Sequence, residues 1–261
     1  MKSLETSLRE LRATGRKALV PYFVAGATSD WVRHVEAAVL AGADAVEIGI
    51  PFSDPMLDGV VIQNASLRAL ELGTTIDSIA TDLSSIATSV PLIAMTYYNL
   101  LYHYGLERVA GKLRECGVVG AIVPDLTVEE AGEWRAAADA SDVATIFLVA
   151  PSTPPERVAL VTSASEGFCY ASSRMAVTGS ATDSVDVTRV VKRVRDCSDL
   201  PTYVGIGIST PQQARAAVNV SDGVIVGSAL VRVIHEGGGA REIEQFIGSF
   251  RNALDAAGGE S

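Results

Sequence analysis

Short hydrophobic runs alternate along the chain with longer stretches in which hydrophobic residues recur at helical spacing. This alternation is typical of a parallel sheet whose strands are connected by helices. The runs are hydrophobic at consecutive positions, as expected of strands that are buried on both faces. They predict eight strands: Ala18–Ala25, Ala45–Ile50, Pro91–Tyr97, Gly120–Val123, Ala144–Val149, Phe168–Ala171, Pro201–Gly205 and Gly223–Val226.

The segments between the hydrophobic runs predict the helices that connect the strands. Residues 1–17 and the segment from Ala240 to about Ala257 are expected to form amphipathic helices. Thr127 and Glu130 have the spacing of a capping box, and Pro155 lies where the first helical turn accepts proline. The other helices are expected to begin near Asp30, Val61, Thr75, Leu106, Thr127, Pro155, Val187, Pro211 and Ser228.

Eight rounds of strand and helix are enough to close a barrel, whereas about five or six would favour an open sheet. The predicted fold class is therefore α/β, a (β/α)8 TIM barrel with an extra N-terminal helix. No linker, low-complexity tract or block of charge divides the sequence, so residues 1–261 are expected to form a single domain. An open doubly wound sheet is the structural alternative.

Composition and charge narrow the class of protein. Hydrophobic residues make up 48% of the 261 positions, which suits a large core, and the net charge of −10 without a basic patch argues against nucleic acid as a partner. No run approaches the roughly 20 hydrophobic residues that span a bilayer, and the first residues lack the layout of a secretory signal. Cys116, Cys169 and Cys197 are far apart and show no metal-ligand spacing, as expected of free thiols. We expect a cytoplasmic protein that does not enter a membrane.

The positions of lysine and histidine restrict the chemistry. No lysine falls at the carboxyl end of a predicted strand, which excludes a Schiff-base aldolase. His34, His103 and His235 are scattered and form no ligand set for a metal-dependent aldolase or epimerase, so no metal is expected. Acid–base chemistry without a metal remains.

Two glycine-containing turns follow the predicted seventh and eighth strands. Residues 205–209 (GIGIS) and 227–229 (GSA) each lead into a helix. Exposed amide N–H groups and the positive end of a helix attract an anion, and the loops after these two strands are the recurrent phosphate site of the TIM barrel. The glycines could instead be simple turn residues, but two such turns at the two expected positions favour a phosphate site.

Two carboxylates stand out near the second strand. Glu47 lies inside a hydrophobic run, and Asp58 lies in the loop that follows. A buried carboxylate is costly unless it is paired or functional, and burial raises its pKa toward the range useful for proton transfer. The alternative is a glutamate paired in the barrel core. Asp54, beside prolines in the same loop, is interpreted as a turn or interface residue.

The predicted sixth strand carries a tyrosine and leads into a segment rich in small residues. Tyr170 is expected either to present its hydroxyl to a ligand or to pack in the core. The residues that follow, through about Ser184, show no periodicity, so they could fold over the site as a lid.

Several motifs together resemble the alpha chain of tryptophan synthase over essentially the whole chain and in the same order. They are VEIGIPFSDPMLDGVVIQ, MTYYN, IVPDL, YASSRMAVTG, VGIGIS and DGVIVGSA. The resemblance implies a lyase that cleaves indole-3-glycerol phosphate to indole and glyceraldehyde 3-phosphate by a retro-aldol reaction. It also implies an αββα heterotetramer with a beta chain, which alone would carry pyridoxal phosphate; no cofactor is expected in this chain.

The resemblance assigns roles to individual residues. It implies that Glu47 shuttles protons, including one to indole C3, and that Asp58 accepts a hydrogen bond from the indole N–H. Tyr170 would lie near the glycerol phosphate, and Thr178 of the lid would bond to Asp58. The phosphate would bind the backbone at Gly179, Gly207, Gly227 and Ser228, and the indole ring would be flanked by Tyr22, Met95, Ile122 and Ile206.

The sequence also departs from the family pattern. Ala176 stands where the lid motif ordinarily has glycine, and Ala27 replaces a frequent aspartate after the first strand. Val60 and Leu100 stand where proline is usual. These changes put coupling to a partner in doubt more than bond cleavage. Two alternative functions stay open: a stand-alone or specialised lyase that releases free indole, and a non-catalytic subunit that activates a beta chain.

Overall fold

The computed structural model describes residues 4–86, 88–172, 184–205 and 207–258. Its parallel strands form a single sheet in the order β5-β4-β3-β2-β1-β9-β8-β7-β6. The bounds are β1 Ala18–Val24, β2 Val46–Gly49, β3 Leu92–Met95, β4 Val118–Ile122, β5 Ala144–Ile146, β6 Leu148–Val149, β7 Cys169–Ser172, β8 Thr202–Gly205 and β9 Gly223–Val226.

The two strands at the ends of this order, β5 and β6, are consecutive in the chain, so they close the sheet into a barrel. They correspond to the predicted strand Ala144–Val149, which is interrupted at Phe147. The Phe147 N–H donates to the side chain of Ser165 at 2.9 Å, while its carbonyl accepts the Tyr170 N–H at 3.2 Å. Before the break the chain pairs with β4, and after it with β7. The TIM-barrel prediction is confirmed and the open-sheet alternative is wrong.

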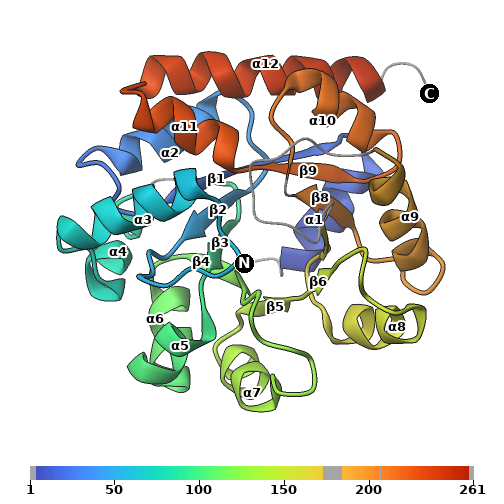
Figure 1. Ribbon diagram of the computed structural model, residues 1–261, viewed down its shortest axis with the longest axis horizontal. Helices are drawn as coiled ribbons and strands as arrows, with labels where there is room; N and C mark the ends of the chain where they lie inside the picture. Colours follow the sequence, from blue (N-terminus) through green and yellow to red (C-terminus); the bar gives the residue numbers. More distant parts are fainter. Residues whose placement is uncertain (1–3, 87, 173–183, 206, 259–261) are drawn as a thin grey trace.

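Helices surround the strands, and α12 runs along one edge of the molecule beside α2, α10 and α11 (Figure 1). Their bounds are α1 Leu4–Ala13, α2 Trp31–Leu40, α3 Val60–Glu71, α4 Ile76–Leu83, α5 Tyr98–Tyr104, α6 Leu106–Glu115, α7 Gly132–Ala140, α8 Pro155–Ala164, α9 Ser184–Arg195, α10 Pro211–Val218, α11 Ser228–His235 and α12 Ala240–Gly258. None of these described helices is long and apolar enough to cross a membrane.

The predicted helices and strands differ from the structure in two regions. The helix expected from Thr127 begins at Gly132, because the Glu130 N–H donates to the Thr127 carbonyl at 3.1 Å and closes a turn before the helix. The third strand was predicted to continue to Tyr97, but β3 ends at Met95. Helix α5 begins at Tyr98, where the sequence pattern predicted no helix.

Alternate residues of each strand face different layers. Val46 and Ile48 belong to the hydrophobic cluster between the strands and the surrounding helices, here called the outer cluster. Ala45 belongs to the cluster inside the barrel, here called the inner cluster, together with Val20, Ile93 and Ile122. The N-terminal helix α1 closes the amino end of the barrel, since Leu4 and Leu8 belong to the inner cluster. A Cβ atom at Gly167 would come within 2.7 Å of the Leu4 side chain, so glycine makes room for this leucine. The three cysteines are free, as predicted.

Candidate active site

Glu47 points into the barrel. Its strand neighbours Val46 and Ile48 pack against the outer helices, and side chains of a strand alternate between faces. The side chain is 1% exposed, and among the described residues its Oε2 atom has no hydrogen-bond partner. Burial, reinforced by the charge of Asp58, raises the pKa of Glu47 from 4.5 to about 8. At neutral pH this carboxyl group is therefore mainly protonated and can donate a proton.

Asp58 lies in the loop between β2 and α3, beyond the carboxyl end of the strand that carries Glu47. It is buried, and its Oδ2 accepts a hydrogen bond of 3.1 Å from the hydroxyl of Tyr97. Burial raises the pKa of Asp58 from 3.8 to about 6, while the hydrogen bond from Tyr97 opposes that rise. Two carboxylates in different environments thus ionise in sequence, Asp58 before Glu47, as in enzymes that assign them different roles.

Two tyrosines share the interior with these carboxylates. Tyr22 of β1 pairs in register with Glu47, and its hydroxyl lies over Gly49, where a Cβ atom would collide with it. Tyr170 of β7 lies in the same way over Gly205, and its hydroxyl leaves no room for a Cβ atom there. Both tyrosines are buried, and their pKa values are raised by burial and by the charges of the two carboxylates.

The two glycine turns lie on one rim. They follow β8 and β9, which are neighbouring parallel strands, so both turns lie at the carboxyl end of the barrel. Gly207 has φ = +103°, a conformation that favours glycine. Gly227 caps α11 without a side-chain cap, and Ser228 opens that helix. Helix N-terminal amides near Ser228 are therefore available to an anion.

The remaining predicted contacts divide into two groups. Met95 and Ile122 are register partners at the ends of β3 and β4, and both belong to or pack against the inner cluster. Thr178, Gly179 and Ile206 lie outside the described residues, as does Ala176. The structure thus brings the described predicted residues together at the carboxyl end of the barrel.

Tyr97 also belongs to this site, although the sequence pattern did not predict it. It follows β3 within the MTYYN motif, and it is 4% exposed. Its hydroxyl bonds to Asp58 and also accepts the Leu57 N–H at 3.1 Å. Its position just past a strand end was the available signal, but its partners lie about 40 residues earlier in the chain.

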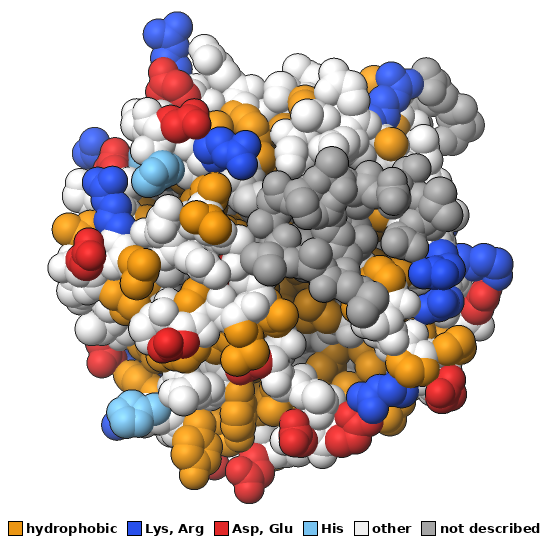
Figure 2. Space-filling view, viewed as in Figure 1, with side chains coloured by type: hydrophobic (Ala, Val, Ile, Leu, Met, Phe, Trp, Pro, Cys, Tyr) orange, Lys and Arg blue, Asp and Glu red, His pale blue; other side chains and the backbone are white. Residues whose placement is uncertain are grey.

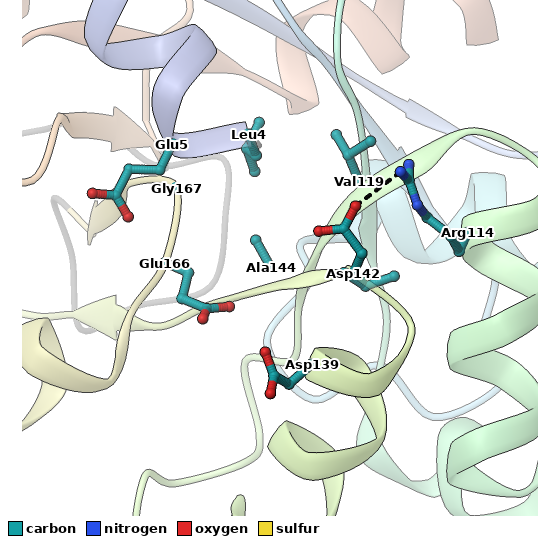
Figure 3. Close-up of a pocket in the computed structure, with 10 residues that line it drawn as sticks. Leu4, Glu5, Arg114, Val119, Asp139, Asp142, Ala144, Glu166 and Gly167 are labelled. Carbon is teal, nitrogen blue, oxygen red and sulfur yellow. Dashed lines mark hydrogen bonds and ion pairs between the residues drawn. The ribbon is translucent and has the colours of Figure 1, made fainter. Parts of the chain in front are cut away.

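A different pocket lies at the amino end of the barrel, away from these residues. It has a volume of about 180 Å³ and is lined by the ends of α1, β4 and β5, with carboxylates from Glu5, Asp139, Asp142 and Glu166 (Figure 3). Arg114 is paired with Asp142 at 2.9 Å. Across the described part of the chain, no group of three or more His, Cys, Asp or Glu side chains could hold a metal ion.

Comparisons with known proteins agree in pointing to one family. A family model described as the tryptophan synthase alpha chain matches residues 8–255. A tryptophan synthase alpha chain of Streptomyces coelicolor is 42% identical over 234 residues, covering 88% of this chain and 86% of the relative. That of Geotalea uraniireducens is 41% identical and covers 98% of this chain and 97% of its own length. A solved tryptophan synthase structure from Mycobacterium tuberculosis has a TM-score of 0.90 at 36% identity, covering 97% of this chain and 99% of that one.

Proposed function

Because this chain belongs to the tryptophan synthase alpha chain family, it is a lyase that cleaves indole-3-glycerol phosphate, and we propose that Glu47 and Asp58 perform the proton chemistry of that cleavage. The observation that carries the assignment is the inward-facing, buried Glu47, whose Oε2 has no described partner. A carboxyl group with a pKa of about 8 is suited to donate a proton at neutral pH and to accept one later in the cycle.

The reaction proceeds in two proton transfers. Glu47 donates its proton to indole C3, which leaves a positive charge on the ring, and Asp58 stabilises that charge by accepting a hydrogen bond from the ring N–H. The Glu47 carboxylate then takes the proton of the side-chain hydroxyl next to C3. The carbon–carbon bond breaks as that hydroxyl becomes an aldehyde, and the bonding electrons neutralise the ring. Glu47 ends protonated, so no net proton is consumed.

The rest of the site positions the substrate. The indole ring lies between Tyr22, Met95 and Ile122. Tyr170 contacts the glycerol phosphate. The phosphate binds backbone amides at Gly207, Gly227 and Ser228, in the turns that follow β8 and β9. Binding energy from a phosphate distant from the reacting bond orients the ring against Glu47.

An exposed hydrophobic surface near the site suits a partner chain. Met56, Leu57, Val60 and Tyr102, here called the rim surface, are large hydrophobic residues left exposed. Val60 lies in α3 and Tyr102 in α5, while Met56 and Leu57 lie in the loop before α3. Figure 2 shows hydrophobic side chains on the surface over these two helices. We propose that the rim surface binds a tryptophan synthase beta chain in an αββα heterotetramer. Residues 1–261 would form one cytoplasmic domain that itself requires no cofactor.

The test is indole release from indole-3-glycerol phosphate by wild-type protein and Glu47→Gln. We expect the variant to lose about 10²–10⁴-fold in kcat, the contribution typical of general acid–base catalysis. The control is Glu244→Gln, which changes an exposed glutamate of α12 and should leave kcat unchanged. Indole production by Glu47→Gln at the wild-type rate would refute the assignment. Repeating the assay with a beta chain separates a coupled subunit, whose rate rises, from a stand-alone lyase.

A further inference from the structure

Tyr97 connects the buried carboxylate of the site to the backbone of an exposed loop. It precedes α5, and its ring stacks on Phe52 with centroids 5.2 Å apart. Its hydroxyl lies 3.1 Å from Asp58 Oδ2 and 3.1 Å from the Leu57 nitrogen. Two adjacent residues of the loop are thus held by one hydroxyl group.

Of the two partners of the Tyr97 hydroxyl, only the Asp58 carboxylate can accept its proton. The Leu57 N–H is a donor, so the hydroxyl must accept from it. An ionised carboxylate only accepts, so the single hydroxyl proton is directed at Asp58. A hydrogen bond to a charged acceptor is roughly twice as strong as one between neutral groups.

From this geometry we propose that Tyr97 is the positioning residue for Asp58, holding its carboxylate in the ionised form and in the orientation that receives the ring N–H of the substrate. This inference rests on the proposed role of Asp58. The loop is also fixed from its other side, because Gln63 Nε2 donates to the Asp58 carbonyl at 2.8 Å. The Asp58 carbonyl therefore keeps a contact that does not depend on Tyr97, whose hydroxyl holds the Asp58 carboxylate and the neighbouring Leu57 N–H.

The electrostatics of the site support the proposal. Burial raises the pKa of Asp58 to about 6, and the hydrogen bond from Tyr97 keeps the pKa from rising further. The charge of Asp58 in turn helps to raise the pKa of Glu47. Loss of the hydroxyl should thus bring the two ionisations closer together, because Asp58 would gain a higher pKa and Glu47 would face less negative charge at neutral pH.

The test variant is Tyr97→Phe, which keeps the ring and its stacking on Phe52 while removing the hydroxyl. The matched control is Tyr104→Phe, which removes another tyrosine–aspartate hydrogen bond, the 2.6 Å contact with Asp77 on the outer surface. We expect Tyr97→Phe to lower kcat/KM about 10- to 100-fold near pH 6, as for loss of a hydrogen bond to a charged group. The deficit should shrink as the pH rises toward 8, whereas the control should match wild type at every pH.

Two further measurements separate positioning from a structural effect. In an Asp58→Asn background, Tyr97→Phe should cause little additional loss, because its effect passes through the carboxylate. The titration of the Asp58 carboxyl, followed by ¹³C NMR without substrate, should move to higher pH in Tyr97→Phe. An unchanged Asp58 titration, a pH-independent loss of activity, or full additivity with Asp58→Asn would each overturn the proposal. Because the NMR titration needs no turnover, it tests Tyr97 even if the wild-type protein releases no indole. Absence of indole release would instead refute the roles proposed for Glu47 and Asp58.

Discussion

The buried carboxylate of Glu47 should make the protein less stable as the pH rises, and replacing it by glutamine should remove that effect. The unfolded chain releases this proton near pH 4.5, whereas the folded protein retains it up to about pH 8. Between these values the folded state binds more protons, so its stability falls with increasing pH. The stabilisation relative to the ionised state is fully present below pH 4.5 and is lost as the pH passes 8.

The size of the effect follows from the difference between the two pKa values. A pKa raised from 4.5 to about 8 corresponds to about 5 kcal/mol in the free energy of unfolding. Part of this arises from the charge of Asp58, which is itself absent at low pH. We therefore expect Glu47→Gln and wild type to have similar stability at pH 5, and the variant to be more stable by several kcal/mol at pH 9.

Urea unfolding of both proteins between pH 5 and pH 9 measures this difference. Because a chain of this length can unfold through intermediates, the midpoint of the first transition is compared rather than an extrapolated free energy. The gap between variant and wild type should widen steadily with pH, and the Glu244→Gln control should show no such trend. A gap that stays constant across the range would mean that Glu47 is not held protonated by its surroundings, and the assignment of its role as proton donor would lose its basis.

Three other substitutions test the site and the frame that supports it. Asp58→Asn should lower kcat/KM by about 10²–10³-fold, because an electrostatic partner of the transition state is lost, while Asp139→Asn at the opposite end of the barrel should have no effect on the same assay. Gly49→Ala introduces a methyl group that collides with the hydroxyl of Tyr22, so it should lower the free energy of unfolding by about 1–3 kcal/mol and weaken substrate binding. Its control is Gly111→Ala in α6, where a Cβ atom meets nothing within 4 Å and should stabilise the protein in thermal unfolding. Leu8→Ala, at the closed end of the barrel, should cost about 2–5 kcal/mol in thermal unfolding yet leave kcat unchanged in the protein that remains folded.

Hydrophobic patterning was sufficient to predict most of the strands, because strands of a barrel are buried on both faces and therefore form continuous hydrophobic runs. It could not predict the interruption at Phe147, since the partner of that N–H is Ser165, 18 residues away. It also missed α5, whose sequence YNLLYHY follows β3 after only two residues and extends the hydrophobic run. Local patterns thus predict burial well and hydrogen-bond partners poorly.

The residues of the candidate site likewise divide into those that a local sequence pattern reveals and those that it does not. Glu47 could be found from sequence because a charged residue inside a hydrophobic strand is unusual, whatever its partners. Tyr97 could not, because nothing local distinguishes it from Tyr98, whose N–H instead bonds to Asp125 at 3.0 Å. The spacing of Thr127 and Glu130 misled for a related reason: the hydroxyl of Thr127 does contact the Glu130 carboxylate at 3.2 Å, but within a turn that precedes the helix.

The interior of the barrel suggests why the site forms where it does. Glycines at inward-facing positions of one strand accommodate tyrosines of a neighbouring strand: Gly49 lies under Tyr22, and Gly205 lies under Tyr170. Each pair fills the core with a ring. The Tyr22 and Tyr170 pairs also direct a hydroxyl toward the carboxyl end of the barrel, where the charges of Glu47 and Asp58 act on both tyrosines. A larger residue at Gly49 or Gly205 would therefore disturb core packing and the polar groups of the site together, so the residues that fill this barrel and those proposed to perform its chemistry cannot vary independently.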